Sequence, residues 1–278
     1  MTHCRQLSLI TLIAFAVAFA VAFAPSLAVA DLPAKRKVLL IGQGPDGHPK
    51  QTHEYMTGVR IVQKLLRNVP NLETAVEQAD GDWRAGPQRI RDADGVFLFV
   101  SEGAKWIHDG PQRLDAFAQL ASRGGGLTAW HWGIGTKPPE PIDGFLRLFG
   151  GCHGGPDRKY QVVEIDVTVA RDHPLTVGLR DFRIHDEFYY RLKFVRAERG
   201  VQPVLTAKID GQVETVAWSW ERPDGGRSFG FSGGHFHENW RRAEYRRLVA
   251  QAILWSIKLP IPDQDFPAAL AESDFELP

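Results

Sequence analysis

Two short, continuous apolar runs constrain the fold more than any other feature of the sequence. Residues 37–42 (KVLLIG) and 95–100 (GVFLFV) lack the alternation of polar and apolar side chains that marks a strand with one solvated face. Each run therefore predicts a strand buried on both faces. Helix-like periodicity follows each run, and residues 127–130 then form a third apolar strand. This β, α, β, α, β order predicts a doubly wound, mostly parallel sheet flanked by helices.

The second half of the chain has a different pattern. Residues 160–170 alternate as an exposed strand would, and residues 201–209 and 213–221 flank Asp210-Gly211, a hairpin turn signal. Extra antiparallel strands are therefore expected here. Residues 240–258 are expected to close one α/β domain that spans residues 37–260. The acidic, Pro-rich residues 261–278 are expected to form a frayed C-terminal tail.

The N-terminus has the features of a secretory signal. Arg5 precedes an apolar run over residues 7–24, and Ala28-Val29-Ala30 has the small-x-small form of a cleavage site. Residues 1–30 are therefore predicted to be a signal peptide, and the protein to be exported to a periplasmic or extracellular location. The alternative is a retained anchor, because about 18 apolar residues approach the length that spans a bilayer. Cleavage would leave no stable membrane span.

Charge and cysteine usage exclude some classes. The 33 basic and 33 acidic residues balance, which gives no electrostatic reason to expect nucleic-acid binding. Cys152 is the only cysteine after residue 30, so no internal disulfide forms. Gly150-x-Cys152-x-Gly154 resembles a nucleophile elbow in its letters, but a helix-like segment precedes it and Gly155-Pro156 follows. Residues 150–156 are therefore expected to form a loop, and Cys152 to be a buried thiol rather than a nucleophile.

Residues 233–240 (GGHFHENW) are the first candidate for function. They follow a strand-like run, 228–232, and precede the last helix. His235 and His237 are two residues apart, so an extended backbone would place both imidazoles on one face. We expect them to line a polar pocket, as metal ligands, acid/base groups or hydrogen-bond partners of a sugar.

Other histidine-bearing segments are expected to meet them. His131 lies between Trp130 and Trp132 in a sharp turn after a strand, where an acyl-transfer enzyme would carry its nucleophile. Residues 185–187 (HDE) lie in an apolar neighbourhood, with His185 and Glu187 on one strand face and Asp186 on the other. The loop after the first strand carries Asp46, His48 and His53. The alternatives are packed, hydrogen-bonded histidines, and surface polarity or a helix cap for residues 185–187.

Imidazole and carboxylate together are standard ligands for zinc and similar divalent metals, although no strict motif such as H-E-x-x-H is present. The predicted metal ligands are His131, His185, Glu187, His235 and His237. Aromatic faces beside a few polar groups are typical of small-molecule sites. The predicted substrate-binding residues are Trp130, Trp132, Tyr189, Trp240, His48 and His237. Beyond a divalent metal such as zinc, the cofactor is unknown.

Several motifs, in order, resemble the trehalose-utilisation (ThuA-like) family over about residues 37–258. They are Asp172 to Leu179 (DHPLTVGL), Asp186-Glu187 followed by Tyr189, Trp218, Gly226-Arg227, Gly234-His235 with Trp240, and a final helix with Trp255. The strand and Gly-rich turn over residues 125–133 also fit the family's pattern.

The resemblance implies a class I glutamine-amidotransferase-like fold without the amidotransferase nucleophile. It also implies a role in carbohydrate utilisation, in a family associated with disaccharides and their 3-keto forms. Carried over by motif, Asp186, Glu187 and His235 are the implied functional positions. Trp-His-Trp at the turn and His237 depart from the commoner pattern, which bears on substrate identity.

The first hypothesis is an exported enzyme that acts on a sugar or glycoside, including a 3-keto form, as a hydrolase, lyase or isomerase. His235 and Glu187 would share the acid/base roles, with Asp186 as a further catalytic candidate. His131 or a metal would stabilise the developing oxyanion. One alternative is a non-catalytic carbohydrate-binding or accessory protein. Another is a metal-dependent hydrolase of other small molecules. The oligomeric state is left open.

Overall fold

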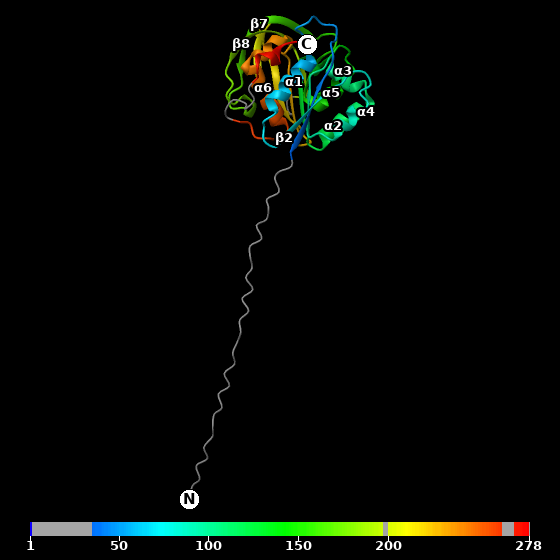
Figure 1. Ribbon diagram of the computed structural model, residues 1–278. Coiled ribbons are helices and arrows are strands. Elements are labelled where there is room, and N and C mark those ends of the chain that lie inside the picture. Colours follow the sequence, from blue (N-terminus) through cyan, green and yellow to red (C-terminus); the bar gives the residue numbers. More distant parts are fainter. Residues whose placement is uncertain (2–34, 197–199, 263–269, 278) are drawn as a thin grey trace. The chain divides into compact units, whose positions relative to one another are not determined.

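The computed structural model describes Met1 and residues 35–196, 200–262 and 270–277 (Figure 1). Beyond Met1, the predicted signal peptide, residues 1–30, lies outside the described residues and stays a prediction. Within the described ranges, no helix is both long enough and apolar enough to cross a membrane. The fold is built on a nine-stranded sheet with the strand order β2-β1-β3-β4-β12-β11-β10-β7-β8.

Five neighbouring strands form the parallel half of this sheet. They are β2 (Leu72–Gln78), β1 (Arg36–Gly42), β3 (Gly95–Leu98), β4 (Gly126–Trp130) and β12 (Arg227–Phe231). The continuous apolar runs became buried central strands, as predicted. β12 comes from the second half of the chain and yet pairs in parallel with β4.

The remaining four strands continue the same sheet in antiparallel pairs. They are β11 (Gln212–Glu221), β10 (Val201–Ile209), β7 (Lys159–Val169) and β8 (Phe182–Tyr190). The hairpin between β10 and β11 turns at Asp210 and Gly211, whose φ values of 51° and 76° are left-handed. The predicted fold class, with antiparallel strands added in the second half, is confirmed.

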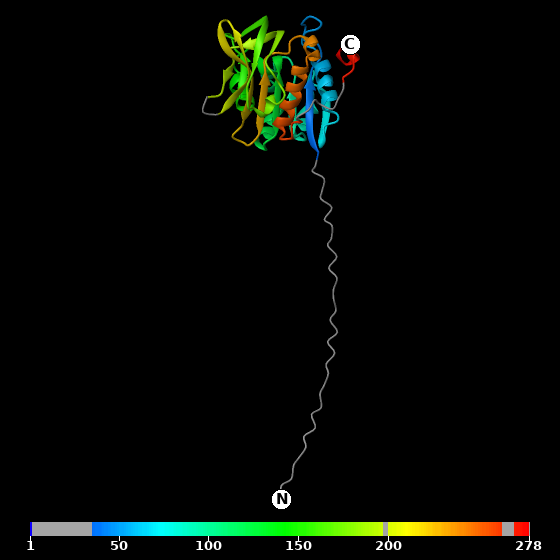
Figure 2. The ribbon, with the colours of Figure 1, turned by 90° about the vertical axis from the view of Figure 1, so that its left-hand side faces the viewer.

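Helices cover both faces of the parallel half. The faces alternate along β1: Val38 and Leu40 belong to one apolar core, and Leu39 and Ile41 to the other. The first core includes α1 (Tyr55–Leu66) and α6 (Ala243–Ser256), which lie side by side in Figure 2. The second core includes α2 (Gly86–Arg91), α3 (Gly103–His108), α4 (Pro111–Ser122) and α5 (Ile142–Phe149).

A small three-stranded sheet was not expected. It consists of β5 (Gly135–Thr136), β6 (Gly151–Gly154) and β9 (Lys193–Phe194), where the sequence predicted a loop at residues 150–156. Cys152 on β6 is fully buried, and burial raises the pKa of its thiol. A buried neutral thiol is a poor nucleophile.

The C-terminal part differs from expectation in two places. The helix expected from residue 240 starts as a 3₁₀ turn, η4 (His237–Arg241), before α6 begins. Of the tail expected to be frayed, residues 263–269 and 278 lie outside the described residues, whereas residues 272–275 form the 3₁₀ turn η5 (Glu272–Phe275), which lies against α1 and η4. Two further short 3₁₀ turns are η1 (His131–Ile134) and η2 (Pro174–Thr176).

Candidate metal centre and substrate pocket

Three parallel strands end at the same edge of the sheet and carry the candidate residues there. β1 is followed by a loop with Asp46, His48 and His53, β4 by His131, and β12 by the loop that holds His235. The carboxyl ends of strands in an open α/β sheet form the usual ligand crevice. β4 and β12 are neighbours, which places residues 131 and 232 side by side. Glu187 and Tyr189 join from β8.

Asp186 fixes the loop after β12. Its side chain is fully buried, and its carboxylate accepts hydrogen bonds from the backbone N–H groups of Gly234, His235 and Phe236 at 2.6–3.3 Å. The hydroxyl of Tyr245 donates to the same carboxylate at 2.7 Å. Burial raises the pKa of Asp186, and these hydrogen bonds counter that effect. Asp186 was predicted to be catalytic, but its carboxylate does not line the pocket and instead positions His235.

His131 is completely buried and adopts a left-handed φ of 48°, which is rare for a side chain of this size. Its Nδ1–H donates to the carbonyl of Ser232 at 3.0 Å, because a carbonyl can only accept. Nε2 therefore carries a lone pair. Burial lowers the pKa of His131 well below its usual value, which keeps the ring neutral.

His53 is held in the same way by a carboxylate. Its Nδ1–H donates to Asp46 Oδ2 at 2.9 Å, and the Tyr55 hydroxyl donates to the same oxygen at 2.7 Å. Burial raises the pKa of Asp46, but hydrogen bonds from His53, Tyr55 and His48 outweigh it and lower that pKa well below its usual range. Burial lowers the pKa of His53. Its free Nε2 lies 3.0 Å from Nε2 of His131.

A short backbone bridge aligns His53 with His235. Thr52 and Phe236 form an isolated antiparallel bridge, in which the N–H of His53 donates to the carbonyl of His235 at 3.1 Å. Nδ1 of His235 then lies 3.2 Å from Nε2 of His131. Burial lowers the pKa of His235 to about 3, so this imidazole is also neutral at pH 7.

Glu187 completes the cluster. Its Oε1 lies 3.6 Å from Nδ1 of His235 and 3.8 Å from Nε2 of His131. Burial, with a contribution from the Asp186 charge, raises the pKa of Glu187 to about 7. The Tyr189 hydroxyl lies 3.0 Å from Nε2 of His131. Three imidazoles and one carboxylate therefore converge on one point.

The donor set fits a divalent metal ion. One ligand atom from each of His53, His131, Glu187 and His235 lies within 4.8 Å of the others. Four of the separations among these atoms are 3.0–3.8 Å, which is the order expected for atoms that each lie about 2.0–2.2 Å from one zinc ion. His53 and His131 each donate their second ring N–H to a carboxylate or a carbonyl, the usual arrangement around metal-bound histidines.

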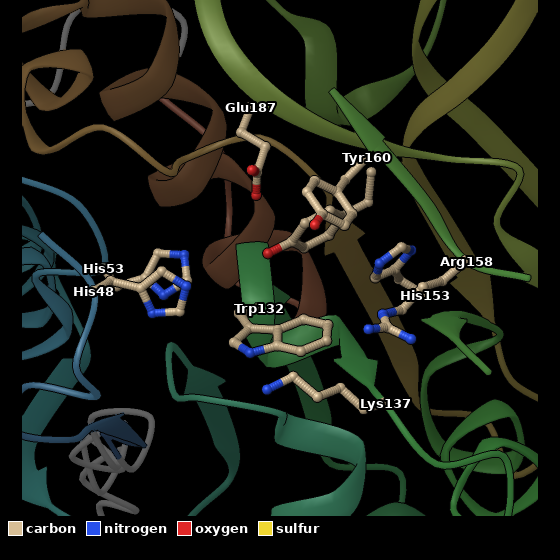
Figure 3. A pocket seen from close by; sticks show the side chains of 9 residues that line it. His48, His53, Trp132, Lys137, His153, Arg158, Tyr160 and Glu187 are labelled. Carbon is tan, nitrogen blue, oxygen red and sulfur yellow. The ribbon is translucent and has the colours of Figure 1, made fainter. Parts of the chain in front are cut away.

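A pocket opens beside this cluster (Figure 3). Its volume is about 120 Å³, below the roughly 300 Å³ of pockets for drug-sized ligands, which indicates a small ligand. Its lining residues are His48, His53, Trp132, Lys137, His153, Arg158, Tyr160, Glu187 and Tyr189. Aromatic faces and hydrogen-bonding groups therefore meet in one cavity.

The structure brings His131, Glu187 and His235 together but places two other predicted metal ligands elsewhere. His185 shares a strand face with Glu187, but two residues along a strand are about 7 Å apart, and its exposed ring stacks on Phe236 instead. His237 is the first residue of η4, so the backbone is no longer extended there. Its Nε2–H donates to the carbonyl of Phe275 at 2.8 Å.

Two of the predicted substrate-binding aromatics lie in the core. Trp130 and Trp240 are 0% and 2% exposed and stack on each other at a ring separation of 5.5 Å. Trp130 also explains why residue 234 is a glycine. The φ of Gly234 is 106°, and a Cβ at this position would lie 2.1 Å from Nε1 of Trp130. Trp132, Tyr189 and His48 do line the pocket, whereas His237 does not.

Five lining or cluster residues were not among the predicted site residues: His53, Lys137, His153, Arg158 and Tyr160. The only sequence feature that could have identified His53 as a site residue is its place in the loop after the first strand. His153 and Arg158 lie on and just after β6, which the sequence did not show as a strand.

A family model described as ThuA, trehalose utilisation, matches residues 39–256. No curated protein matches the chain.

Two solved structures of ThuA-like proteins are similar to this chain at the level of the fold. A ThuA-like protein from Parabacteroides merdae aligns with a TM-score of 0.62 at 15% identity, over 88% of this chain and 100% of that one. A ThuA-like protein from Bacteroides uniformis aligns with a TM-score of 0.61 at 15% identity, over 83% and 95%. PurLQS from Thermotoga maritima aligns with a TM-score of 0.46 at 18% identity, over 79% and 98%.

Replacing Asp186 by Asn should destabilise the fold by about 3 kcal/mol. The amide nitrogen of Asn cannot accept the hydrogen bonds that the backbone N–H groups donate to the carboxylate. Chemical denaturation measures this. Asp166→Asn is the matched control, since its side chain is 78% exposed and should change the free energy of unfolding by less than about 0.5 kcal/mol. Equal effects of the two changes would contradict the anchoring role of Asp186.

The cluster should bind about one divalent metal ion per chain, measured by elemental analysis and by calorimetric titration of the metal-free protein with Zn²⁺, Mn²⁺ and Ni²⁺. His235→Ala should weaken binding more than about 100-fold, and Asp46→Asn about 10–100-fold. His185→Ala should bind like the wild type. Failure of the wild type to bind any of these ions, or equal loss in His185→Ala, would contradict the site.

Proposed function

Because the chain belongs to the ThuA trehalose-utilisation family, we propose that it is an exported, metal-dependent enzyme of carbohydrate utilisation. It removes or adds a proton next to the carbonyl of an oxidised sugar or glycoside. His53, His131 and His235 hold the metal, and Glu187 transfers the proton.

One observation carries this proposal. Nε2 of His53 and Nε2 of His131 lie 3.0 Å apart, yet both rings already use Nδ1–H as a donor. Each Nε2 then presents a lone pair, and neither can donate to the other. Two lone pairs at this separation repel unless a cation or a hydrogen-bond donor lies between them, and the Tyr189 hydroxyl is within donor distance of only the His131 atom. Since burial disfavours protonated rings at both positions, a metal ion is the better-fitting cation.

A bound divalent cation supplies a Lewis acid that stabilises negative charge on a substrate oxygen. The chain's own residues supply the rest. Glu187 lines the pocket beside the imidazoles, at the boundary where a substrate C–H or O–H group would lie. Trp132 offers an apolar ring face to a sugar ring, whereas the ring of Tyr189 is stacked on His131 and His153.

The arrangement does not support glutamine amidotransferase chemistry. The turn after β4 carries His131, a ring whose Nδ1 is committed to the Ser232 carbonyl. The only cysteine of the described residues, Cys152, is buried, and burial raises the pKa of its thiol. Neither provides the activated nucleophile that acyl transfer requires.

Export rests on the N-terminal sequence. If residues 1–30 are a cleaved signal, expression with an intact N-terminus should yield a secreted protein that begins at Asp31. N-terminal sequencing and intact mass measure the cleavage, and a fractionated culture locates the product. A full-length chain retained in the membrane fraction would contradict export by cleavage and favour an anchor.

Proton transfer can be tested without knowing the final product. The metal-loaded protein should catalyse exchange of the C–H protons next to the carbonyl of a 3-keto-glycoside in D₂O, followed by NMR. Glu187→Gln should slow this exchange by about 10²–10⁴-fold while retaining the metal. Chelation should abolish the exchange, and returning the metal should restore it.

His185→Ala serves as the control for this assay and should exchange at the wild-type rate. Sugar binding without exchange or product in the metal-loaded wild type would overturn the enzymatic reading and support a binding protein. An unchanged rate in Glu187→Gln would remove Glu187 from its proposed role.

A further inference from the structure

The pocket has a second wall that the proposed chemistry does not use. Lys137 follows β5, His153 is on β6, and Arg158 follows β6. Figure 3 shows His153 and Arg158 across the pocket from His48 and His53, with Lys137 between the two sides. The small sheet β5-β6-β9 positions this wall.

The wall is cationic. The lining residues include two permanent cations, Lys137 and Arg158, and one carboxylate, Glu187, which lies on the metal side. The ammonium group of Lys137 lies 3.5 Å from Glu102 Oε1 and is partly neutralised. Arg158 has no carboxylate partner within the described residues, and its NH1 donates only to the carbonyl of Gly155 at 3.2 Å. A guanidinium without a counter-ion attracts an oxyanion, which it can bind through two parallel hydrogen bonds.

His153 adds a neutral hydrogen-bonding group to this wall. It is 1% exposed, and its ring stacks on Tyr189 at a centroid separation of 4.1 Å. Its Nδ1 is buried and has no hydrogen-bond partner within the described residues. An orphaned buried N–H is rarer than an orphaned acceptor, which favours the proton on Nε2. His153 lines the pocket, so its Nε2–H is the group that can donate to an oxyanion there, whereas the lone pair of Nδ1 can only accept.

We propose that this wall binds an oxyanion on the substrate, so that the protein acts on an acidic sugar, in which a carboxylate or a phosphate is attached to the ring. Arg158 pairs with the oxyanion, Lys137 adds charge, and His153 donates a hydrogen bond to it. The inference rests on the proposed function, since it takes the ligand to be a sugar. In this proposal the cationic wall discriminates between acidic and neutral sugars. The histidine cluster, with Glu187, carries out the proton transfer.

Calorimetry on the metal-loaded protein tests the inference with three probes: glucuronate, glucose 6-phosphate and methyl glucoside. At least one acidic probe should bind more tightly than the neutral one, and the comparison between the two acidic probes identifies a carboxylate or phosphate preference. Arg158→Gln should weaken binding of the preferred acidic probe about 10–100-fold, the range for a hydrogen bond to a charged group, and leave methyl glucoside unchanged. Lys137→Gln should have a smaller effect in the same direction.

Arg84→Gln is the matched control, because its side chain is 90% exposed and lies outside the pocket lining. Metal content and thermal unfolding confirm that each variant is folded. Equal affinity of the wild type for neutral and acidic probes, or equal effects of Arg158→Gln and Arg84→Gln, would overturn the inference while leaving the proposed function in place. Absence of binding to all three probes, together with no exchange on a 3-keto-glycoside, would overturn both.

Discussion

The buried carboxylate of Asp186 is the interaction on which the site depends. It lies on β8, at the far antiparallel edge of the strand order, and accepts hydrogen bonds from three consecutive N–H groups after β12, in the parallel half. Through these bonds the two halves of the sheet hold one loop. Because His235 is in that loop and Glu187 follows Asp186 directly, a single buried group sets the position of both.

Much of the fold was predictable because parallel strands buried on both faces appear in the sequence as continuous apolar runs. The convergence of His131 with His235 was also predictable, since the carboxyl ends of neighbouring parallel strands meet at one edge. The error at His185 has a simple cause: periodicity gives the face of a strand but not the position along it. His237 was misplaced because the chain leaves the extended conformation at that residue. The position of His53 beside His235 depends on the Thr52–Phe236 bridge, and no local sequence pattern predicts that bridge.

The two walls of the pocket have different electrostatic character for a structural reason. The imidazoles lie where the main sheet and its helices remove them from water, and burial keeps them neutral. Lys137 and Arg158 follow short strands of the small sheet, nearer to solvent, where a charge is easily retained. The sequence showed a loop at β6, and the second wall therefore could not be assembled from sequence patterns alone. A ligand in this pocket meets the neutral histidine cluster on one side and fixed positive charge on the other.

The pairing of β12 with β4 also has a consequence for how the chain folds. His131 and Ser232, which this pairing joins, are 101 residues apart in the chain. Closing so long a loop is slow, because its entropy is lost before the contacts form. Three imidazoles from three distant segments cannot meet until this step is complete. Unlike the small zinc domains that remain unfolded without their ion, this topology makes folding precede metal capture, and its kinetics should be governed by strand pairing rather than by the supply of metal.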